Sequence, residues 1–540
     1  MGFTRGWVRP LAAAVAGAVV VVLVPVLAAG PAGAAAGPGP VPAISWHACP
    51  AGSAAAQAGG FTCATVAAPL DYRDRSGPKI MLAVVRHAAT GPSRRGVIFA
   101  NPGGPGGEGT VQIPAWIGFW PGALLRDYDI VSWDPRGIGA STAVQCFPNQ
   151  AAENAFLGKY ANFPADSRQQ RGYIRRWRTF GKTCAARDGA RLRHVSTADT
   201  ARDLDLLRQA LGQPKLNYLG LSYGTFLGAT YANLFPRRVG RLVLDGNIAP
   251  TAWTNGGRPN PGLSISMRIG STTWVAKTLA AFLRICGQRP VRDCAFSAGS
   301  PAATRAKWDA LLARLRRAPI MLGSTAVTYT QLVTGISDTL DIVQPFTTPV
   351  TNGGAQGWSG AAQVLQELWT ARHHTPGTQP ASAPAAAAAR QRYPGPEQGL
   401  SVTCGDAPSP PAGAFAGLQR LVLGRGGVIG LPDLWGDEPC ATWPVHQDDA
   451  YRGPWNAPTS PILVIGNTTD PSTPLRDAVA MTRQLANARL LIVHGYGHTA
   501  FLNPSSCAQN YVTAYFRTGA LPPNGTVCQQ NRPPFAPPAG

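Results

Sequence analysis

Short apolar runs alternate with amphipathic stretches over most of this chain. Apolar and β-branched runs that end in Gly, Pro, Asn or Asp are typical of buried strands, whereas apolar residues spaced three and four apart are typical of helices. Strands are expected at residues 61–70, 80–88, 96–100, 128–133, 216–221, 239–244, 462–466 and 489–493. Helices are expected between them, at 168–193, 200–211, 226–234 and 475–485. This alternation predicts an α/β fold with a mostly parallel central sheet, whose antiparallel edge is formed by the first two strands.

The pattern changes between residues 247 and 456, where helices dominate. They are expected at 272–286, 302–317, 329–343 and 361–373. The second has one apolar face, made of Trp308, Leu311, Leu312 and Leu315. Such a face indicates packing rather than chemistry. A Pro- and Ala-rich segment, 375–396, follows and is expected to be a flexible surface loop.

Helices inserted into a sheet-containing core are typical of a lid over an active site. We therefore expect four parts. Residues 1–36 would be a signal peptide, 37–246 the first part of the core, 247–456 the helical lid, and 457–540 the C-terminal part of the core.

The N-terminal segment has the features of an export signal. Arg5 and Arg9 form a positive start, residues 11–30 an apolar stretch, and 32–34 or 34–36 a small-residue cleavage site. An uncleaved membrane anchor is the alternative, because the apolar stretch is long enough to span a bilayer. Its Ala, Val and Gly content favours cleavage, so we expect a secreted protein with no stable membrane partner.

Cysteine usage agrees with export. The 10 cysteines include no Cys-x-x-Cys pair, and their even number favours disulfides over a metal site. Pairing of neighbours along the chain is the simplest arrangement, although sequence alone does not fix it: Cys49 with Cys63, Cys146 with Cys184, Cys286 with Cys294, Cys404 with Cys440, and Cys507 with Cys528.

The formal net charge is +21, carried mostly by arginine. A basic protein invites a nucleic-acid interpretation, but no helix-turn-helix, zinc-finger or Lys/Arg-run pattern accompanies the charge. We interpret it as a generally basic surface and expect no nucleic-acid partner. Such a surface would favour anionic cell-wall polymers as partners.

The sequence Gly220-Leu221-Ser222-Tyr223-Gly224 lies between an expected strand and an expected helix. In α/β-hydrolases this pattern is the nucleophile elbow, a sharp turn that lifts the serine hydroxyl above the sheet. The Gly-rich loop 101–109 also follows a strand, and bare backbone there lets an N–H approach a substrate carbonyl. No Gly-Lys-Ser/Thr follows it, so it is not a phosphate loop. We assign the oxyanion hole to the backbone N–H groups of Gly104 and Tyr223.

A serine nucleophile needs a base and an acid that orients the base. Asp470 and His498 follow two late strands, which reproduces the Ser, Asp, His chain order of this fold. Three rivals are set aside. His494 is expected to end a strand and point into the packing, Asp245 follows an earlier strand, and Asp134 is expected to fix its own loop together with Arg136.

Together these motifs resemble exported bacterial α/β-hydrolases of the prolyl and tripeptidyl aminopeptidase group. The matching segments are 101–107, 133–137, 220–225, 244–246, 470–474 and 497–498. The resemblance implies Ser222, Asp470 and His498 as the triad, a helical lid, and a C-terminal region like that of tripeptidyl aminopeptidases. We expect no cofactor and no metal.

One residue departs from that resemblance. Glu108 stands where a small residue is expected, and it could either bind a substrate's free amine or favour a helix N-terminus electrostatically; we favour the second. Asp338, Asp341 and Glu367 in the lid are further amine-binding candidates, with a solvated helix face as the alternative.

The favoured function is a secreted serine exopeptidase acting on peptides with free N-termini. Its rivals are a carboxylesterase or lipase with the same triad, and a silent binding scaffold.

Overall fold

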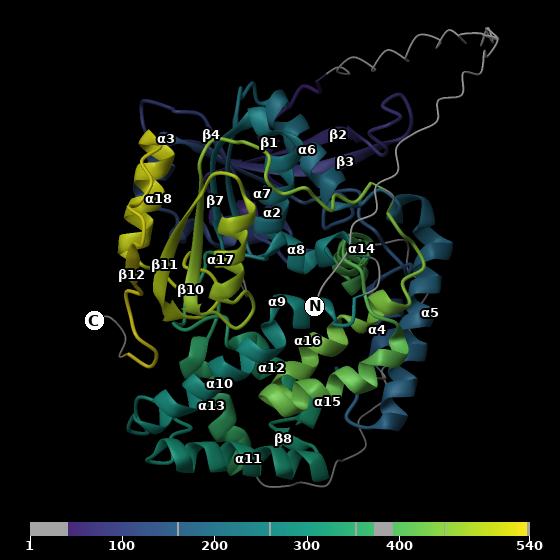
Figure 1. The fold of residues 1–540 in the computed structure, drawn as a ribbon, viewed down its shortest axis with the longest axis vertical. Helices are drawn as coiled ribbons and strands as arrows, with labels where there is room; N and C mark the ends of the chain where they lie inside the picture. The colour runs from purple at the N-terminus through teal and green to yellow at the C-terminus, as the bar shows by residue number, and fades with distance from the viewer. Residues whose placement is uncertain are drawn as a thin grey trace, which may run out of the picture. The chain divides into compact units, whose positions relative to one another are not determined.

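The structure is a computed structural model that describes residues 41–158, 161–258, 261–350, 354–371, 392–447 and 449–536. These residues form one ten-stranded sheet (Figure 1). In spatial order its strands are β1 (His47–Ala48), β2 (Phe61–Pro69), β3 (Lys79–His87), β5 (Asp129–Trp133), β4 (Val97–Asn101), β6 (Leu216–Leu221), β7 (Val239–Asp245), β10 (Ile462–Thr469), β11 (Ala488–Tyr496) and β12 (Val527–Gln529). The first three strands and the β3–β5 pair are antiparallel, and every later pair is parallel, as predicted.

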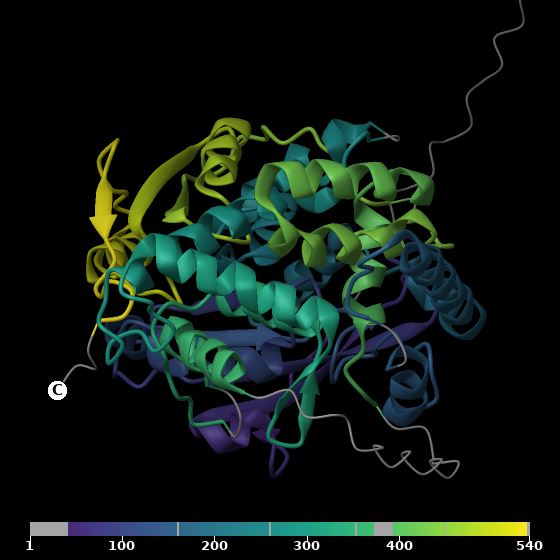
Figure 2. The same cartoon turned by 90° about the horizontal axis from the view of Figure 1, so that it is seen from below.

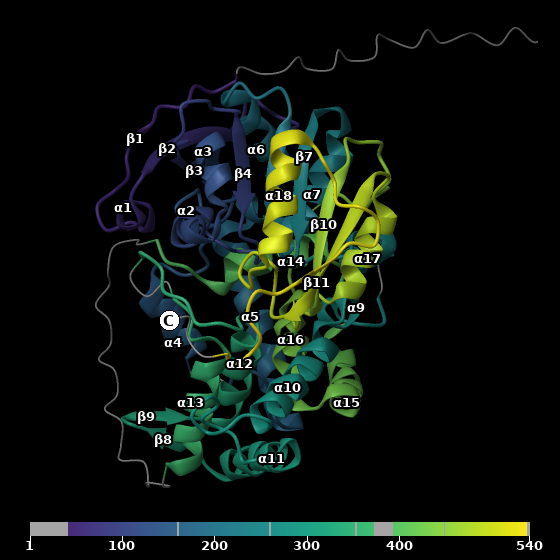
Figure 3. The ribbon, with the colours of Figure 1, turned by 90° about the vertical axis from the view of Figure 1, so that its left-hand side faces the viewer.

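Successive side chains along each strand point to opposite faces of the sheet, and helices cover both faces. Tyr218 points to the face covered by α6 (Thr197–Ala210), α7 (Tyr223–Leu234) and α17 (Leu475–Gln484). Its neighbour Leu219 points to the face covered by α2 (Gly109–Ala115), α3 (Gly122–Asp127) and α18 (Ser506–Thr518) (Figure 3). The remaining helices of this part are α1 (Ala54–Ala58), α4 (Gln150–Leu157) and α5 (Ser167–Leu192).

The chain between β7 and β10, which we call the helical insertion, has a hydrophobic core of its own. Its helices are α8 (Pro250–Trp253), α9 (Ile265–Ile269), α10 (Ser271–Gly287), α11 (Pro301–Arg317), α12 (Tyr329–Thr339), α13 (Gly357–Thr370), α14 (Pro396–Asp406), α15 (Phe415–Gly426) and α16 (Leu431–Gly436), with a hairpin of β8 (Ile320–Leu322) and β9 (Thr325–Val327). Trp308, Leu311, Leu312 and Leu315 of α11 are all buried in that core, as their spacing predicts. In Figure 2 the teal and green helices of the insertion lie in front of the sheet.

Several boundaries differ from prediction for local reasons. Helix α12 ends at Thr339 rather than 343, because the Val343 N–H donates to the Asn503 side chain (2.9 Å) instead of continuing the helix. The expected loop 375–396 lies largely outside the described residues, and Pro396 begins α14, as proline does at a first helical position. Helices α14, α15, α16 and α18 were not predicted at all.

All 10 cysteines lie in the described residues, and they form the five predicted neighbour disulfides. Disulfides of this number are typical of proteins that fold outside the cytoplasm. The predicted signal peptide, residues 1–36, lies outside the described residues. Among the helices that the structure describes, none combines the length and apolar character needed to cross a membrane.

Candidate active site

Ser222 occupies a strained turn between β6 and α7. Its φ of 56° and ψ of −125° are uncommon for a residue with a side chain. The flanking glycines make the turn possible. A methyl group on Gly220 would lie 2.3 Å from the Gly224 carbonyl oxygen, and one on Gly224 would lie 2.9 Å from the Asn101 carbonyl oxygen. The strand, turn and helix therefore present the serine hydroxyl at the N-terminus of α7, as the motif predicts.

The Gly-rich loop packs directly against this turn. A methyl group on Gly103 would lie 2.8 Å from the Ser222 Cβ and 3.2 Å from the Tyr223 nitrogen. The Gly103 N–H is already bonded to the Asn101 side chain (3.0 Å). In contrast, the N–H groups of Gly104 and Tyr223 have no acceptor among the described residues. Two unpaired N–H groups beside a serine are the arrangement that a developing oxyanion requires.

Asp470 and His498 lie on adjacent loops, after β10 and β11. The His498 Nδ1 is 2.9 Å from Asp470 Oδ2 and 3.1 Å from Oδ1. The Asp470 carboxylate is fully buried and also accepts the backbone N–H groups of Ser472 (2.9 Å) and Thr473 (2.8 Å). The Thr473 hydroxyl donates to it as well (3.1 Å). The acid is thus fixed in place and can hold one tautomer of the imidazole.

Ser222 and His498 line one cavity of about 540 Å³. No hydrogen bond joins their side chains among the described residues, and such bonds often tighten only once substrate is bound. Burial on its own would lower the pKa of His498, but the carboxylates of Asp470, Asp341 and Asp245 raise this pKa to about 9. The geometry brings the three predicted triad residues to one site, and their catalytic roles stay a prediction.

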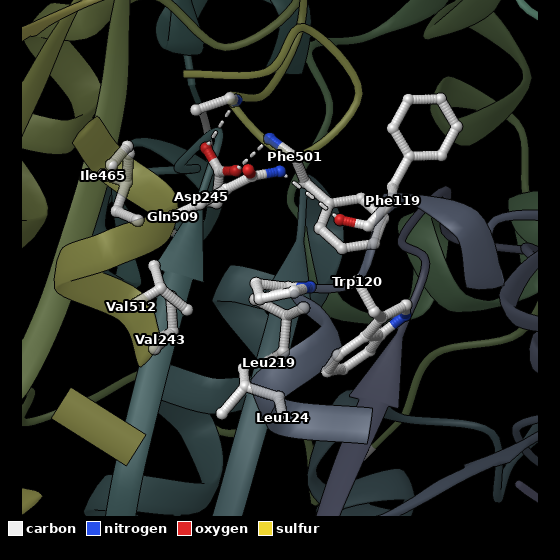
Figure 4. Close-up of a pocket in the computed structure, with 13 residues that line it drawn as sticks. Phe119, Trp120, Leu124, Leu219, Val243, Asp245, Ile465, Phe501, Gln509 and Val512 are labelled. Carbon is white, nitrogen blue, oxygen red and sulfur yellow. Dashed lines mark hydrogen bonds between the residues drawn. The ribbon is translucent and has the colours of Figure 1, made fainter. Parts of the chain in front are cut away.

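The rival acid Asp245 has no hydrogen bond to the His498 imidazole among the described residues. Its carboxylate accepts the backbone N–H groups of Ala500 (3.0 Å) and Phe501 (2.8 Å), so it holds the loop that follows the histidine (Figure 4). Burial raises its pKa to about 7. It closes one end of a separate apolar cavity of about 30 Å³, which lies between the sheet and α18.

The other rivals also have different roles. The expectation that His494 points into the packing was wrong: it lies inside β11, and its side chain is exposed. Asp134 accepts the N–H groups of Thr110 (2.8 Å) and Ala140 (2.7 Å) and so fixes its loop, as predicted. Arg136 forms a buried ion pair with Asp203 (2.6 Å).

Carboxylates of the helical insertion line the same cavity as Ser222. Asp341 is one of them, and its carboxylate accepts a hydrogen bond from the Ser472 hydroxyl (2.7 Å). Burial raises the pKa of Asp341 to about 6. Asp433 and Asp437, from α16 and the residue after it, also line the cavity, and sequence reasoning missed both. Their only sequence signal is acidity at a short helix, which many surface helices share.

Asp433 and Asp437 differ in the partners of their carboxylates. Asp437 accepts bonds from the Ser266 N–H (2.7 Å) and hydroxyl (3.0 Å). Asp433 has a side-chain hydrogen bond with Ser271 and no cation as an ion-pair partner among the described residues. Burial first, and then the carboxylates of Asp437 and Asp341, raise the pKa of Asp433 to about 8. A partly buried acid crowded by other acids would ionise readily once a cation arrived.

The remaining amine-binding candidates do not line this cavity. Glu108 is the N-cap residue of α2, but its side chain makes no capping hydrogen bond. Its Cγ lies close to Gly139, since a methyl group added to that glycine would be 2.7 Å from it. Glu367 is exposed on α13. Asp338, at the end of α12, lies near enough to Asp341 and Asp433 to raise their pKa values.

Helix α14 forms part of the cavity wall and is anchored by a buried carboxyl pair. Glu397 accepts hydrogen bonds from the Cys146 N–H (3.1 Å) and the Tyr393 hydroxyl (2.8 Å). It also contacts Glu153 of α4, whose pKa burial and the Glu397 carboxyl together raise to about 8. The raised pKa favours a protonated Glu153 beside Glu397 near neutral pH.

Comparisons with known proteins agree with this geometry. A family model described as alpha/beta hydrolase fold matches residues 96–284, and one described as TAP-like protein matches residues 429–528. The tripeptidyl aminopeptidase of Streptomyces coelicolor is 29% identical over 491 residues, covering 87% of this chain and 84% of that protein. Serine protease Hip1 of Mycobacterium tuberculosis is 29% identical over 503 residues, covering 87% and 88%.

Carboxylesterase B of Mycobacterium tuberculosis is 32% identical over 491 residues, which cover 86% of each chain. The similarity to these relatives thus extends across the sheet and the helical insertion alike. The chain belongs to the α/β-hydrolase family and carries a TAP-like C-terminal region.

Proposed function

We propose that this hydrolase is a secreted serine exopeptidase that removes short peptides or single residues from free N-termini. The observation that carries the proposal is the composition of the cavity. Ser222 and His498 share it with Asp341, Asp433 and Asp437. An otherwise basic protein, with a net charge of +21, thus lines its reaction site with acids, and a protonated peptide N-terminus is their natural partner.

In this reaction the Ser222 hydroxyl attacks the scissile carbonyl while His498 accepts its proton. Asp470 keeps the other imidazole nitrogen protonated. The N–H groups of Gly104 and Tyr223 stabilise the oxyanion, and each such donor is worth roughly 2.7–4 kcal/mol. His498 then protonates the leaving amine, and an acyl-enzyme remains on Ser222. Water, activated by the same histidine, releases the N-terminal fragment.

The substrate's ammonium group would bind the acidic side of the cavity. Asp433 is its main partner, because Asp437 already accepts two hydrogen bonds from Ser266, whereas Asp433 has the Ser271 side chain as its hydrogen-bond partner. The apolar side chains of Trp253, Ile265 and Leu400 line the same cavity and suit apolar substrate side chains. We propose that residues 247–456 act as a lid that restricts access to chain ends.

A carboxylesterase is the second candidate, and the 32% identity to Carboxylesterase B favours it. The same triad cleaves esters, whose bonds are easier to break. The acidic residues distinguish the two functions, because an uncharged ester gains nothing from them.

The test compares a tripeptide nitroanilide with a free N-terminus, its N-acetylated form, and a short-chain nitrophenyl ester. The exopeptidase should cleave the free peptide at least about tenfold better than the acetylated one, as expected for the loss of a charged contact. Equal turnover of both peptides, or turnover of the ester alone, would contradict the proposal. The Ser222→Ala variant serves as the control and should cleave none of the three.

A further inference from the structure

The turn that carries His498 is bonded to the helical insertion as well as to the sheet. The His498 N–H donates to the carbonyl of Asp341, at 2.7 Å. Asp341 belongs to the short segment 341–343 that follows α12. The backbone of the proposed base is therefore attached to a part of the chain that lies far from it in sequence.

A single buried side chain joins the same two segments. Asn503 is 1% exposed, and its amide nitrogen lies 2.8 Å from the His498 carbonyl oxygen, 3.0 Å from that of Asp341 and 3.2 Å from that of Thr499. Its amide oxygen accepts the Val343 N–H at 2.9 Å. Because three acceptors surround the nitrogen and one donor faces the oxygen, these partners fix the orientation of the amide.

The histidine turn needs such support because its backbone is strained. Thr499 has a φ of 65°, which is uncommon for a β-branched residue. Gly497 has a φ of 86°, and a methyl group on it would lie 2.6 Å from the Asn503 amide. Strained conformations persist only where surrounding contacts hold them. Asn503 supplies contacts to both sides of His498.

We propose that Asn503 is a positioning residue for His498, and that it acts by joining the histidine turn to the segment 341–343 of the helical insertion. This inference rests on the proposed serine-hydrolase chemistry, although not on the preference for peptides. It follows that the imidazole stays aligned between Asp470 and Ser222 only while segment 341–343 is docked. The insertion then contributes to the chemical step as well as to substrate selection.

The test uses Asn503→Leu, which keeps the size of the side chain, removes its hydrogen bonds and adds no charge. Asn247→Leu is the matched control. Asn247 is also fully buried, and its amide donates to the Leu244 (3.2 Å) and Ile465 (2.7 Å) carbonyls at the same edge of the sheet. It has no hydrogen bond to the histidine turn or to segment 341–343 among the described residues.

Kinetics are measured with the nitrophenyl ester, so that the result does not depend on the peptide N-terminus. Asn503→Leu should lower kcat about 10- to 100-fold with KM changed less than about threefold, the cost of a misplaced catalytic group. The acid limb of its kcat/KM profile should also move to lower pH, because His498 is held less closely to Asp470. Asn247→Leu should lower the melting temperature without either kinetic change.

An Asn503→Leu protein with wild-type kcat and an unmoved acid limb would overturn the inference, whatever its melting temperature. If that variant does not fold, Asn503→Ser carries the same test with the same two outcomes, since it leaves a polar group and room for water. Failure of the proposed peptidase function would appear separately, as equal cleavage of free and acetylated peptides by the wild-type protein.

Discussion

The cavity has two walls of different origin. The sheet supplies Ser222 and His498 to the cavity, with the buried Asp470 behind the histidine, and each lies at the carboxyl end of a strand. The helical insertion supplies Asp341 and Asp433, which sit on or after short helices. In the proposed mechanism the sheet wall would cleave any activated carbonyl. The helical wall carries the charge that would choose among substrates.

This difference separates chemistry from selectivity. Peptidases and an esterase occur among the relatives at about the same identity, so the reacting residues do not decide between them. On the proposed function, the residues of the insertion that line the cavity would make this choice. Changes to the sheet wall should therefore affect every substrate alike. A change to Asp433 on the helical wall should affect only substrates with a free amine, whereas Asp341 also acts on His498 and so on every substrate.

The largest effect is expected from removing the nucleophile. Ser222→Ala should lower kcat on the ester and on the peptide by about 10⁴-fold or more, as for other serine triads. Single-turnover kinetics and labelling by a fluorophosphonate check this. Activity retained on either substrate would show that the sheet wall does not act as a unit.

A smaller but still large loss is expected from Asp470→Asn. The amide cannot hold the required imidazole tautomer, so kcat should fall roughly 10³- to 10⁴-fold on both substrates. Asp245→Asn is the matched control. Among the described residues that carboxylate bonds only the loop after His498, and its loss should cost no more than about 100-fold. Equal losses in the two variants would contradict the assignment of Asp470, rather than Asp245, as the acid of the triad.

The pH profile should show how the helical wall acts on the base. His498 must be neutral to accept a proton, and its pKa is raised to about 9, so kcat/KM on the ester should rise with pH up to about 9. Asp341→Asn removes one of the carboxylates that raise this pKa. Its acid limb should move to lower pH, which gives a several-fold gain at pH 7. A profile unchanged by the substitution would mean that Asp341 has no electrostatic effect on the histidine.

The smallest effect concerns how α14 is attached. The folded chain keeps a proton on Glu153 up to about pH 8, whereas the unfolded chain loses it near the ordinary glutamate pKa. The folded state thus binds more protons, and stability should fall as pH rises from 5 to 8. Glu153→Gln should remove part of that fall, by an amount on the order of 1 kcal/mol. Urea unfolding at both pH values measures it, and an identical fall in both proteins would contradict the raised pKa of Glu153.

The sheet wall could be predicted from the sequence because strand order and motif spacing encode it locally. Gly220 to Gly224, Asp470 and His498 each follow an apolar run, and parallel strands bring such ends to one edge. The five disulfides followed from neighbour pairing.

The helical wall could not be predicted in the same way. Asp433 reaches the cavity only through the packing of α16 against other insertion helices, which no short motif encodes. Of the four acids suggested from the sequence, Asp341 alone lines the cavity, while Glu108 packs beside Gly139. Asn503 follows His498 closely in sequence, yet its bond to Val343 spans 160 residues. Such long-range contacts are set by tertiary structure and not by periodicity.

The most direct measurement compares kcat/KM for the free and N-acetylated forms of one tripeptide nitroanilide, in the wild-type protein and in Asp433→Asn. We predict that the wild-type protein prefers the free peptide by about 10- to 100-fold, that the substitution brings this ratio close to one, and that kcat/KM on the ester stays within about twofold. A ratio that the substitution leaves unchanged, or a loss shared equally by ester and peptides, would contradict the division of labour between the two walls.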